Sequence, residues 1–158
     1  LGEVADRQFP MFASCFGFQA LVVALGHPVE KDEPNAEVGT FELSTTEAAA
    51  HDPLFGPFPS KFYAQLGHKD RAMSFPDHAV LLARSERCPY QALRIGTTVY
   101  ATQFHPELTA EANRTRFARY LDDYRHVFGR ERADAMLDEF IPSPHADGLL
   151  PRFSELLA

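Results

Sequence analysis

The sequence predicts a layered α/β domain, and three observations lead to this fold class. An apolar run at residues 10–14 is followed at residues 17–25 by a helical pattern that is apolar on nearly every face. A helix of this kind is usually packed inside a layered α/β domain. Strand-like runs and a further helical period come after it. The length of 158 residues, with 45% apolar composition, is enough for one domain with a buried core.

The predicted elements follow in order along the chain. Residues 10–14 form a buried strand, and Gly26 is placed to end the helix of residues 17–25. Residues 38–45 alternate apolar and polar side chains, as in a strand with one solvated face, and residues 46–59 are rich in loop-forming residues. The other predicted strands are separated by turn formers and comprise residues 62–66, 79–83, 91–95 and 99–104.

The C-terminal part of the chain changes to a helical period. Four side chains at i, i+3, i+4 and i+7 predict one helical face after Thr109, namely Phe117, Tyr120, Leu121 and Tyr124. Two further helical stripes follow Gly129. They consist of Ala133, Met136, Leu137, Phe140 and Ile141, and of Phe153, Leu156 and Leu157. We therefore predict a domain at residues 1–124 and a helical extension at residues 125–158.

Charge and hydropathy argue against several classes of protein. The net charge of -7 argues against a general nucleic-acid binder, which needs a basic face for phosphates. No apolar run approaches the roughly 20 residues of a membrane span, and no secretory signal is recognisable. Two cysteines make a poor disulfide framework. We therefore expect a cytoplasmic protein with reduced thiols and without nucleic-acid or membrane partners, and we leave a homo-oligomer open.

The sequence predicts neither a cofactor nor a metal. It contains no G-x-G-x-x-G motif and no phosphate loop, which would indicate a nucleotide site. Paired short spacings typical of zinc sites, such as C-x₂-C or H-x₃-H, are also missing. Cys88 precedes a proline at the start of a predicted strand, and we interpret it as structural.

Cys15 is a candidate nucleophile because it lies between a predicted strand and a predicted helix. A tight strand-to-helix turn presents its side chain away from the sheet and needs small neighbours, here Ala13 and Gly17. The start of a helix also favours a thiolate. The alternative, a small cysteine buried in an apolar stretch, fits these residues equally well.

A candidate base and its orienting acid lie at the end of a later strand. Residues 103–107 read QFHPE, and residues i and i+2 of an extended segment face the same side. Pro106 keeps His105 extended, so that Glu107 can hold the imidazole in one tautomer. Together with Cys15, this pair makes a candidate Cys-His-Glu triad, since a thiol nucleophile needs a base.

The two motifs together resemble those of the class I glutamine amidotransferase family, G-x-C-x-G-x-Q and Q-F-H-P-E. The chain reads ASCFGFQ at residues 13–19 and QFHPE at residues 103–107. Intermediate segments are similar to the branch containing the glutaminase domain of GMP synthase. They are AEVGTFEL (36–43), DPLFGPFP (52–59), LGHKD (66–70) and LLARSERCPYQALRIG (81–96). The resemblance covers residues 8–124 and implies a flavodoxin-like three-layer sandwich.

The resemblance also implies roles for individual residues. Cys15 would be the nucleophile, His105 the general base and then acid, and Glu107 the orienting acid. The backbone N–H of Phe16 would be one oxyanion donor, and Gln19 would help to hold the substrate. The implied reaction is hydrolysis of glutamine to glutamate and ammonia through a γ-glutamyl thioester, with the ammonia used by a separate synthase. His68 and Asp70 lie in a segment expected to form a loop near the site; they form either a solvent-facing turn or a part of the loop that shapes the site.

The chain departs from the family pattern in three places. Ala13 replaces a glycine, and Phe18 replaces a residue that is often His or Met. The third departure is more serious. Family domains begin with a strand, a helix, a second strand and a Gly-rich loop that donates the second oxyanion N–H. Here residues 1–9 resemble only the end of the helix that precedes the nucleophile strand. A parallel sheet shortened in this way would expose hydrophobic edges. We therefore expect either a fragment or a second chain that completes the sheet.

Two other functions stay open at this stage. A hydrolase of γ-glutamyl conjugates would use the same triad on a different substrate. An inactive fragment that acts as a binding or regulatory module through its C-terminal helices would need no complete oxyanion hole.

Overall fold

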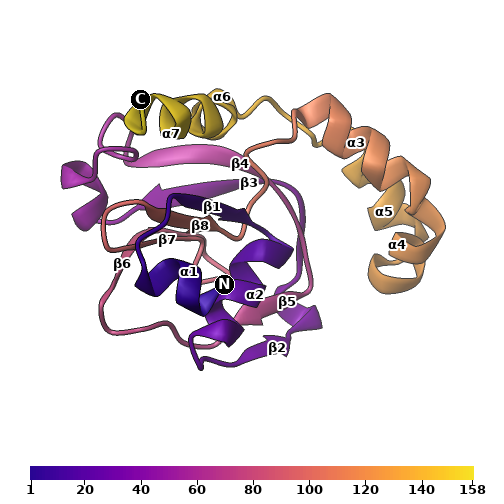
Figure 1. The fold of residues 1–158 in the computed structure, drawn as a ribbon. Coiled ribbons are helices and arrows are strands. Elements are labelled where there is room, and N and C mark those ends of the chain that lie inside the picture. The colour runs from indigo at the N-terminus through magenta and orange to yellow at the C-terminus, as the bar shows by residue number, and fades with distance from the viewer.

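A mixed six-stranded sheet forms the centre of the protein in the computed structural model, which describes residues 1–158 (Figure 1). Its strand order is β1-β8-β7-β6-β3-β4. The strands are β1 (Met11–Ser14), β3 (Glu37–Thr45), β4 (Lys61–His68), β6 (Ala79–Arg84), β7 (Ala92–Ile95) and β8 (Val99–Thr102). A separate two-stranded sheet pairs β2 (Val29–Lys31) with β5 (Asp70–Ala72). All the predicted strands are confirmed, with bounds that differ by at most two residues at either end.

Only one pair of neighbouring strands in the large sheet is parallel. β1 runs parallel to β8, whereas every pairing among β3, β4, β6, β7 and β8 is antiparallel. The expectation of a parallel sheet was therefore wrong for this part of the fold. The links at residues 85–91 and 96–98 are too short for a crossover, which takes about a dozen residues or more, so they can only join antiparallel strands.

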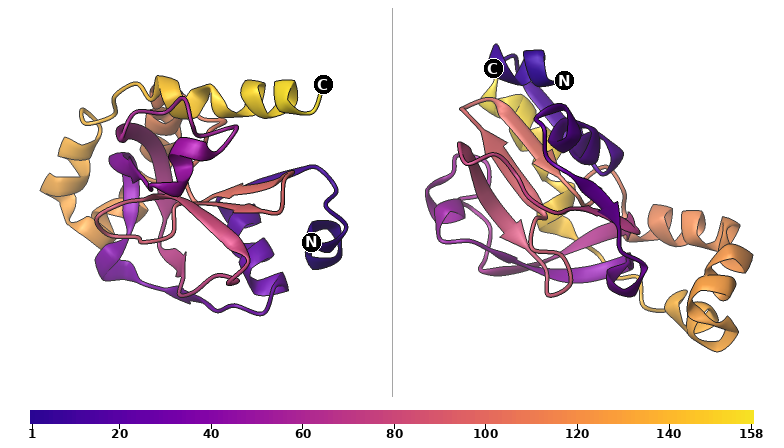
Figure 2. Two further views of the ribbon diagram at one scale, coloured as in Figure 1. Left: turned by 90° about the vertical axis from the view of Figure 1, so that its left-hand side faces the viewer. Right: turned by 90° about the horizontal axis from the view of Figure 1, so that it is seen from below.

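Helices cover both faces of the sheet and make three layers. Alternate residues of β8 face opposite sides, so Tyr100 enters one buried cluster while Val99 and Ala101 enter the other. The first cluster is closed by α6 (Pro144–Asp147) and α7 (Leu149–Leu156), and the second by α1 (Gly2–Asp6) and α2 (Phe16–Ala24). Figure 2 shows these layers from two further directions.

Helix α2 is less enclosed than its composition predicts. Phe18, Leu21 and Val22 are buried against the sheet, but Val23 is 57% exposed. The expectation of a helix packed inside a layered domain is met on the side facing the sheet only, because no other element of this chain covers its outer side. The predicted end is confirmed, since the helix stops at Ala24 and Gly26 adopts a φ of +85°.

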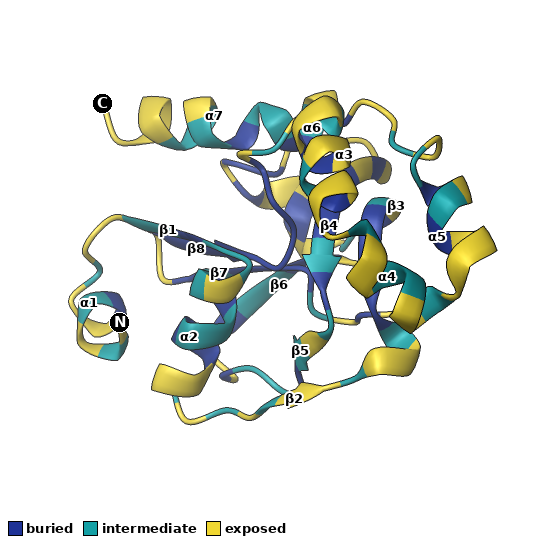
Figure 3. Ribbon diagram, turned by 90° about the vertical axis from the view of Figure 1, so that its right-hand side faces the viewer, coloured by how far each residue is buried: buried dark blue, intermediate teal, exposed yellow.

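The first predicted C-terminal helix is divided in two. α3 (Ala110–Arg119) ends at Tyr120, and α4 (Leu121–Phe128) begins immediately after it. Phe117 still stacks on Tyr124, with ring centroids 4.4 Å apart. Tyr120 itself is exposed, because the break turns it out of the expected stripe. Figure 3 shows that much of the outer surface of α4 is exposed.

The predictions for the last two helical stripes are only partly correct. α5 (Arg130–Met136) ends before Phe140 and Ile141, although Phe140 still packs near Phe117. α7 buries Leu149 and partly buries Phe153, but leaves Leu156 and Leu157 exposed. A third cluster joins Val38 and Phe117 to Ala133 and Met136, across the expected domain boundary. The division at residue 124 stays a prediction. No helix has the length and apolar character needed to cross a membrane.

The loop at residues 46–59 is tied to the sheet by Asp52. The carboxylate accepts hydrogen bonds from the backbone N–H groups of Leu54 and Phe55, and Arg94 Nε donates to it from 2.7 Å. The Asp52 side chain is completely buried. Its removal would leave these donors without an acceptor inside the protein.

We expect Asp52→Ala to lower the free energy of unfolding by about 3 kcal/mol, because it breaks a buried ion pair and orphans several donors. Urea unfolding followed by circular dichroism measures the change. The matched control is Asp122→Ala, which removes a carboxylate that is 88% exposed and paired with Arg125. That control should change stability by less than about 0.5 kcal/mol. Equal effects of the two variants would contradict this role of Asp52.

Candidate active site

Cys15 occupies a strained turn between β1 and α2. Its φ of 48° and ψ of -103° lie outside the ordinary regions for a residue with a side chain, at a cost of about 1–3 kcal/mol. The backbone N–H of Cys15 donates to the Thr102 carbonyl at 2.7 Å, which fixes the turn against the end of β8. This strand-turn-helix geometry is the one that presents a nucleophile above a sheet.

Small neighbours make the Cys15 turn possible. A Cβ at Gly17 would lie 3.4 Å from the Cβ of Ala13, at the lower limit of an ordinary van der Waals contact. Ala13 is buried and pairs with Ala101 of β8. An alanine at position 13 is therefore small enough for this turn, whereas larger side chains at both positions would collide.

The parallel pairing of β1 and β8 brings the two sequence motifs together. Ser14 pairs with Thr102, so Cys15 and Gln103 follow the carboxyl ends of adjacent strands. Gln103 Nε2 donates to Cys15 Sγ at 3.8 Å. His105 is buried, and its Nδ1 lies 2.6 Å from Glu107 Oε1. The predicted proximity of His105 and Glu107 is thus present in the structure.

Two opposing effects act on the pKa of His105. Burial disfavours the imidazolium, but contacts with Cys15 and Glu107 outweigh burial and raise the pKa of His105 to about 9. Burial likewise disfavours ionisation of Glu107, yet its hydrogen bond to His105 holds the pKa of this carboxyl below its usual range. Arg116 of α3 also contacts the ring, with its Nη1 3.2 Å from His105 Nε2.

Gln19 also reaches the site from α2. Its Nε2 donates to the Asp70 carbonyl at 2.8 Å and to Gln103 Oε1 at 3.2 Å. Asp70 therefore contributes through its backbone, while its residue as a whole is exposed. Phe16 is the first residue of α2 and is 79% exposed. Helix geometry leaves its backbone N–H without an intrahelical acceptor.

The sequence predicts that His68 lies in a loop, and this prediction is wrong. His68 ends strand β4 and is buried, with Nδ1 3.0 Å from the Asp70 carbonyl and Nε2 3.0 Å from Glu37 Oε2. The physical reason is that β4 continues its pairing with β3 to the register Glu37–His68. His68 thus contacts the Asp70 carbonyl, which also accepts a hydrogen bond from Gln19.

Glu37, His68 and Cys88 form a buried cluster whose ligand atoms lie within 4.8 Å of one another. Such a set could hold a metal ion, but its groups already interact: His68 and Gln91 both contact Glu37 Oε2. Burial also raises the pKa of the Cys88 thiol to about 11, whereas a metal binds the thiolate. We therefore describe the cluster as a hydrogen-bonded network, and the absence of a metal stays a prediction.

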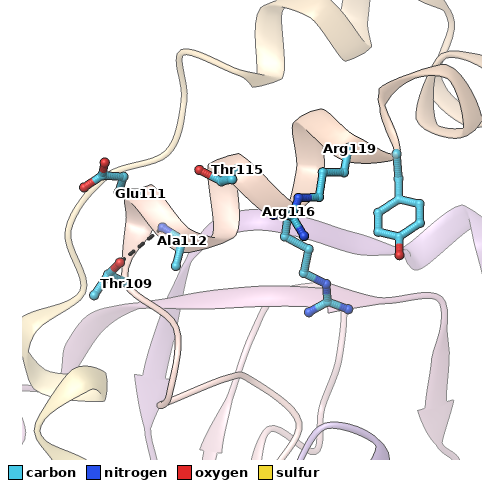
Figure 4. Close-up of a pocket in the computed structure, with 7 residues that line it drawn as sticks. Thr109, Glu111, Ala112, Thr115, Arg116 and Arg119 are labelled. Carbon is cyan, nitrogen blue, oxygen red and sulfur yellow. Dashed lines mark hydrogen bonds between the residues drawn. The ribbon is translucent and has the colours of Figure 1, made fainter.

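Sequence reasoning missed two residues that touch the triad. Gln103 was part of the quoted QFHPE motif, so its contact with Cys15 had a local signal. Arg116 had none, because it reaches His105 only through the packing of α3. Arg116 and Arg119 also line a depression of about 570 Å³ along α3 (Figure 4). Cys15 does not line this depression.

Comparison with protein families gives this geometry a context. The sequence matches the family model described as glutamine amidotransferase class-I over residues 1–121. The chain belongs to this family. The resemblance inferred from the two motifs is thereby confirmed.

Curated relatives of this amidotransferase domain include GMP synthases. The GMP synthase (glutamine-hydrolyzing) of Thermosipho melanesiensis is 40% identical over 107 residues, which are 67% of this chain and 20% of that protein. A protein of Thermoplasma acidophilum, named as one of the subunits of GMP synthase (glutamine-hydrolyzing), is 30% identical over 127 residues, covering 80% of this chain and 58% of that one. The chain thus spans a fifth to somewhat more than half of these relatives.

Solved structures confirm the α/β, flavodoxin-like fold of the amidotransferase domain. The crystal structure of SMU.1228c has a TM-score of 0.78 at 27% identity and covers 99% of this chain and 67% of that one. A glutamine amidotransferase from Thermotoga maritima has a TM-score of 0.72 at 22% identity, with coverages of 97% and 64%. The latter likeness concerns the fold alone.

We expect Glu107→Gln to lower the pKa of His105 from about 9 toward its ordinary value of 6.5, because the carboxylate favours the imidazolium. Titration of the ring by NMR measures the pKa directly. Glu111→Gln, an exposed carboxylate change in the first turn of α3, serves as the control and should leave the titration unchanged. An unaltered His105 titration in Glu107→Gln would refute the assigned contact.

Proposed function

We propose that the protein hydrolyses the side-chain amide of glutamine, with Cys15 as nucleophile, His105 as base and acid, and Glu107 as the orienting carboxylate. The observation that carries the proposal is the strained Cys15 turn, which is bonded to Thr102 beside the His105–Glu107 pair. Membership of the glutamine amidotransferase family supports the choice of an amide substrate.

The first half of the reaction forms a thioester. His105 Nε2 takes the proton of the Cys15 thiol, and the sulfur attacks the carbonyl carbon of the glutamine amide. The Phe16 N–H at the start of α2 donates to the oxyanion of the tetrahedral intermediate. His105 returns the proton to the amide nitrogen, the C–N bond breaks, and ammonia leaves a γ-glutamyl thioester on Cys15.

The second half of the reaction restores the thiol. His105 removes a proton from water, which attacks the thioester carbonyl, and the C–S bond breaks to give glutamate. The proton then returns from His105 to the Cys15 sulfur. Throughout, Glu107 accepts a hydrogen bond from Nδ1–H, which keeps Nε2 directed toward the reacting atoms. Gln19, held beside Gln103, lies where it can bind the rest of the substrate.

A second oxyanion donor is proposed to come from a segment that pairs with β1. Strand β1 lies at one edge of the sheet and is bonded to β8 alone, so its other side offers unpaired backbone groups. A strand added at this edge would end beside Cys15. The greater length of the curated relatives is consistent with an additional segment of this kind.

We further propose that the ammonia passes to a synthase that is separate from this chain. The relatives include proteins named as subunits of GMP synthase, which supports a synthase partner without identifying it. The compound that accepts the ammonia is left open by this support, and a homo-oligomer stays an open prediction.

We expect Cys15→Ser to reduce glutamine hydrolysis by roughly a thousandfold or more, because the hydroxyl is a far weaker nucleophile than the thiol. Release of ammonia and glutamate measures the rate, and mass spectrometry of the acid-quenched protein detects the γ-glutamyl thioester. Cys88→Ser is the matched control, since Cys88 is buried away from the turn. This variant should keep the thioester if it folds.

The same assay separates the proposal from its competitors. Hydrolysis of γ-glutamyl amides without hydrolysis of glutamine would replace it by a conjugate hydrolase. If neither substrate reacts and an electrophilic glutamine analogue does not label Cys15, the proposal of an enzyme is wrong and a binding module takes its place.

A further inference from the structure

Arg116 brings an unpaired positive charge to the edge of the candidate active site. It extends from α3 toward the sheet (Figure 4), and its Nη1 lies 3.2 Å from His105 Nε2. The partly buried Arg71 and Arg94 each pair with a carboxylate, at 2.6 and 2.7 Å, whereas no ion pair involves Arg116. The contact with His105 engages only one nitrogen of the guanidinium, so its other N–H donors are free to bind a ligand.

Gly67 of β4 leaves the room in which this guanidinium lies. A Cβ at Gly67 would lie 3.6 Å from Arg116 Nη1 and 3.8 Å from both Cζ and Nη2. These are ordinary contact distances for a methyl group, but a longer side chain at this position would enter the space of the guanidinium. The absence of a side chain at position 67 therefore lets the arginine lie against the backbone of β4, next to His105.

The same stretch of backbone, residues 67–70, also holds Gln19. Gln19 comes from α2, the helix that begins directly after Cys15, and its Nε2 donates to the Asp70 carbonyl at 2.8 Å. Arg116 lies over the first residue of the stretch, and Gln19 is bonded to the last. Side chains from two helices thus meet the same short piece of backbone beside the candidate nucleophile.

The charges around His105 leave Arg116 without a counterion. Burial lowers the pKa of His105, but contacts with Cys15 and Glu107 outweigh it and raise the pKa to about 9, so the ring is mostly protonated near neutral pH. Glu107 is engaged at the other ring nitrogen, 2.6 Å from Nδ1. A protonated ring beside Arg116 places two cations in contact, and an anionic group at the free donors of the guanidinium would offset their repulsion.

A glutamine substrate carries an anion of this kind. Its α-carboxylate lies at the opposite end of the molecule from the side-chain amide that Cys15 attacks in the proposed reaction. A planar guanidinium binds a carboxylate through two parallel hydrogen bonds, which are stronger than those between neutral groups. An unpaired arginine at the edge of the triad therefore has the chemistry needed to hold this end of the substrate.

We propose that Arg116 is a specificity-determining residue whose guanidinium binds the α-carboxylate of the substrate while the side-chain amide lies at Cys15. The inference rests on the proposed function, because it concerns the substrate of the same triad. The protein would then select glutamine, or another γ-glutamyl compound with a free α-carboxylate, over a glutamine whose α-carboxylate is part of a peptide bond.

Arg119 provides the matched comparison for this role. It lies about one turn further along α3, is exposed and lines the same depression of about 570 Å³ as Arg116 (Figure 4). Like Arg116, it pairs with no carboxylate, but it makes no contact with the triad. A general attraction of anions to this surface would involve both arginines, whereas recognition of the substrate would involve only Arg116.

The test compares two ligands on a protein that binds without turnover. Cys15→Ala removes the nucleophile, and isothermal titration calorimetry measures the dissociation constants of glutamine and of glutamine α-methylamide. The second ligand keeps the side-chain amide and the α-ammonium group but has no α-carboxylate. Arg116→Met, Arg116→Lys and the control Arg119→Met are each combined with Cys15→Ala in the whole chain.

We expect Cys15→Ala to bind glutamine roughly 10 to 100 times more tightly than the α-methylamide, which is the effect of a hydrogen bond between charged groups. Adding Arg116→Met should weaken glutamine binding by the same factor and leave α-methylamide binding unchanged. Arg116→Lys should lie between the two, because an ammonium keeps the charge but not the planar fork. Arg119→Met should change neither affinity. A side chain with only a packing role would weaken both ligands alike.

Equal affinities for the two ligands, equal weakening of both by folded Arg116→Met, or binding of neither would overturn the role of Arg116. Thermal unfolding establishes that the variant is folded, and Arg116→Gln replaces it if Met is not tolerated. Ammonia release with Cys15 present decides the proposed function separately. Selective binding of glutamine without ammonia release would refute hydrolysis and keep Arg116 as a carboxylate-binding residue. Hydrolysis of both compounds at equal rates would keep the proposed function and refute this role.

Discussion

The parallel pairing of β1 with β8 is the constraint on which the candidate site depends. It places the carboxyl ends of two strands, far apart in the sequence, at the same edge of the sheet. Cys15 follows one of these ends and His105 the other, while the hydrogen bond from Cys15 N–H to the Thr102 carbonyl closes the turn between them. Without this register the two motifs would have no reason to meet.

This arrangement carries structural costs that the surrounding residues offset. The left-handed backbone at Cys15 is tolerated because Ala13 and Gly17 are small and because β8 holds the turn. The same pairing leaves β1 at the margin of the sheet, with one side unbonded. A strained nucleophile turn and an open strand edge thus occur side by side, which makes the edge a natural position for a segment that completes the site.

A buried polar network supports the triad from the opposite side. The Gln65 carbonyl accepts from the His105 backbone, while the Gln65 side chain contacts Asn113 of α3 and Ser143 just before α6. The residues at 125–158 are therefore linked to the backbone of the candidate base. Because α3 also carries Arg116, the packing of one helix determines both the support of His105 and the position of the Arg116 guanidinium 3.2 Å from His105 Nε2.

The six strands of the central sheet, the Cys15 turn and the pairing of His105 with Glu107 were predictable from local patterns of neighbouring residues, whereas β2 and β5 were not predicted. The sequence by itself did not determine the antiparallel course of most strands, the break at Tyr120, the burial of His68 or the contact of Arg116 with His105. Those features depend on the register between strands and on how helices pack against them. Contacts of this kind join residues distant in sequence and leave no periodic pattern in the chain, so they become visible once the elements are packed together.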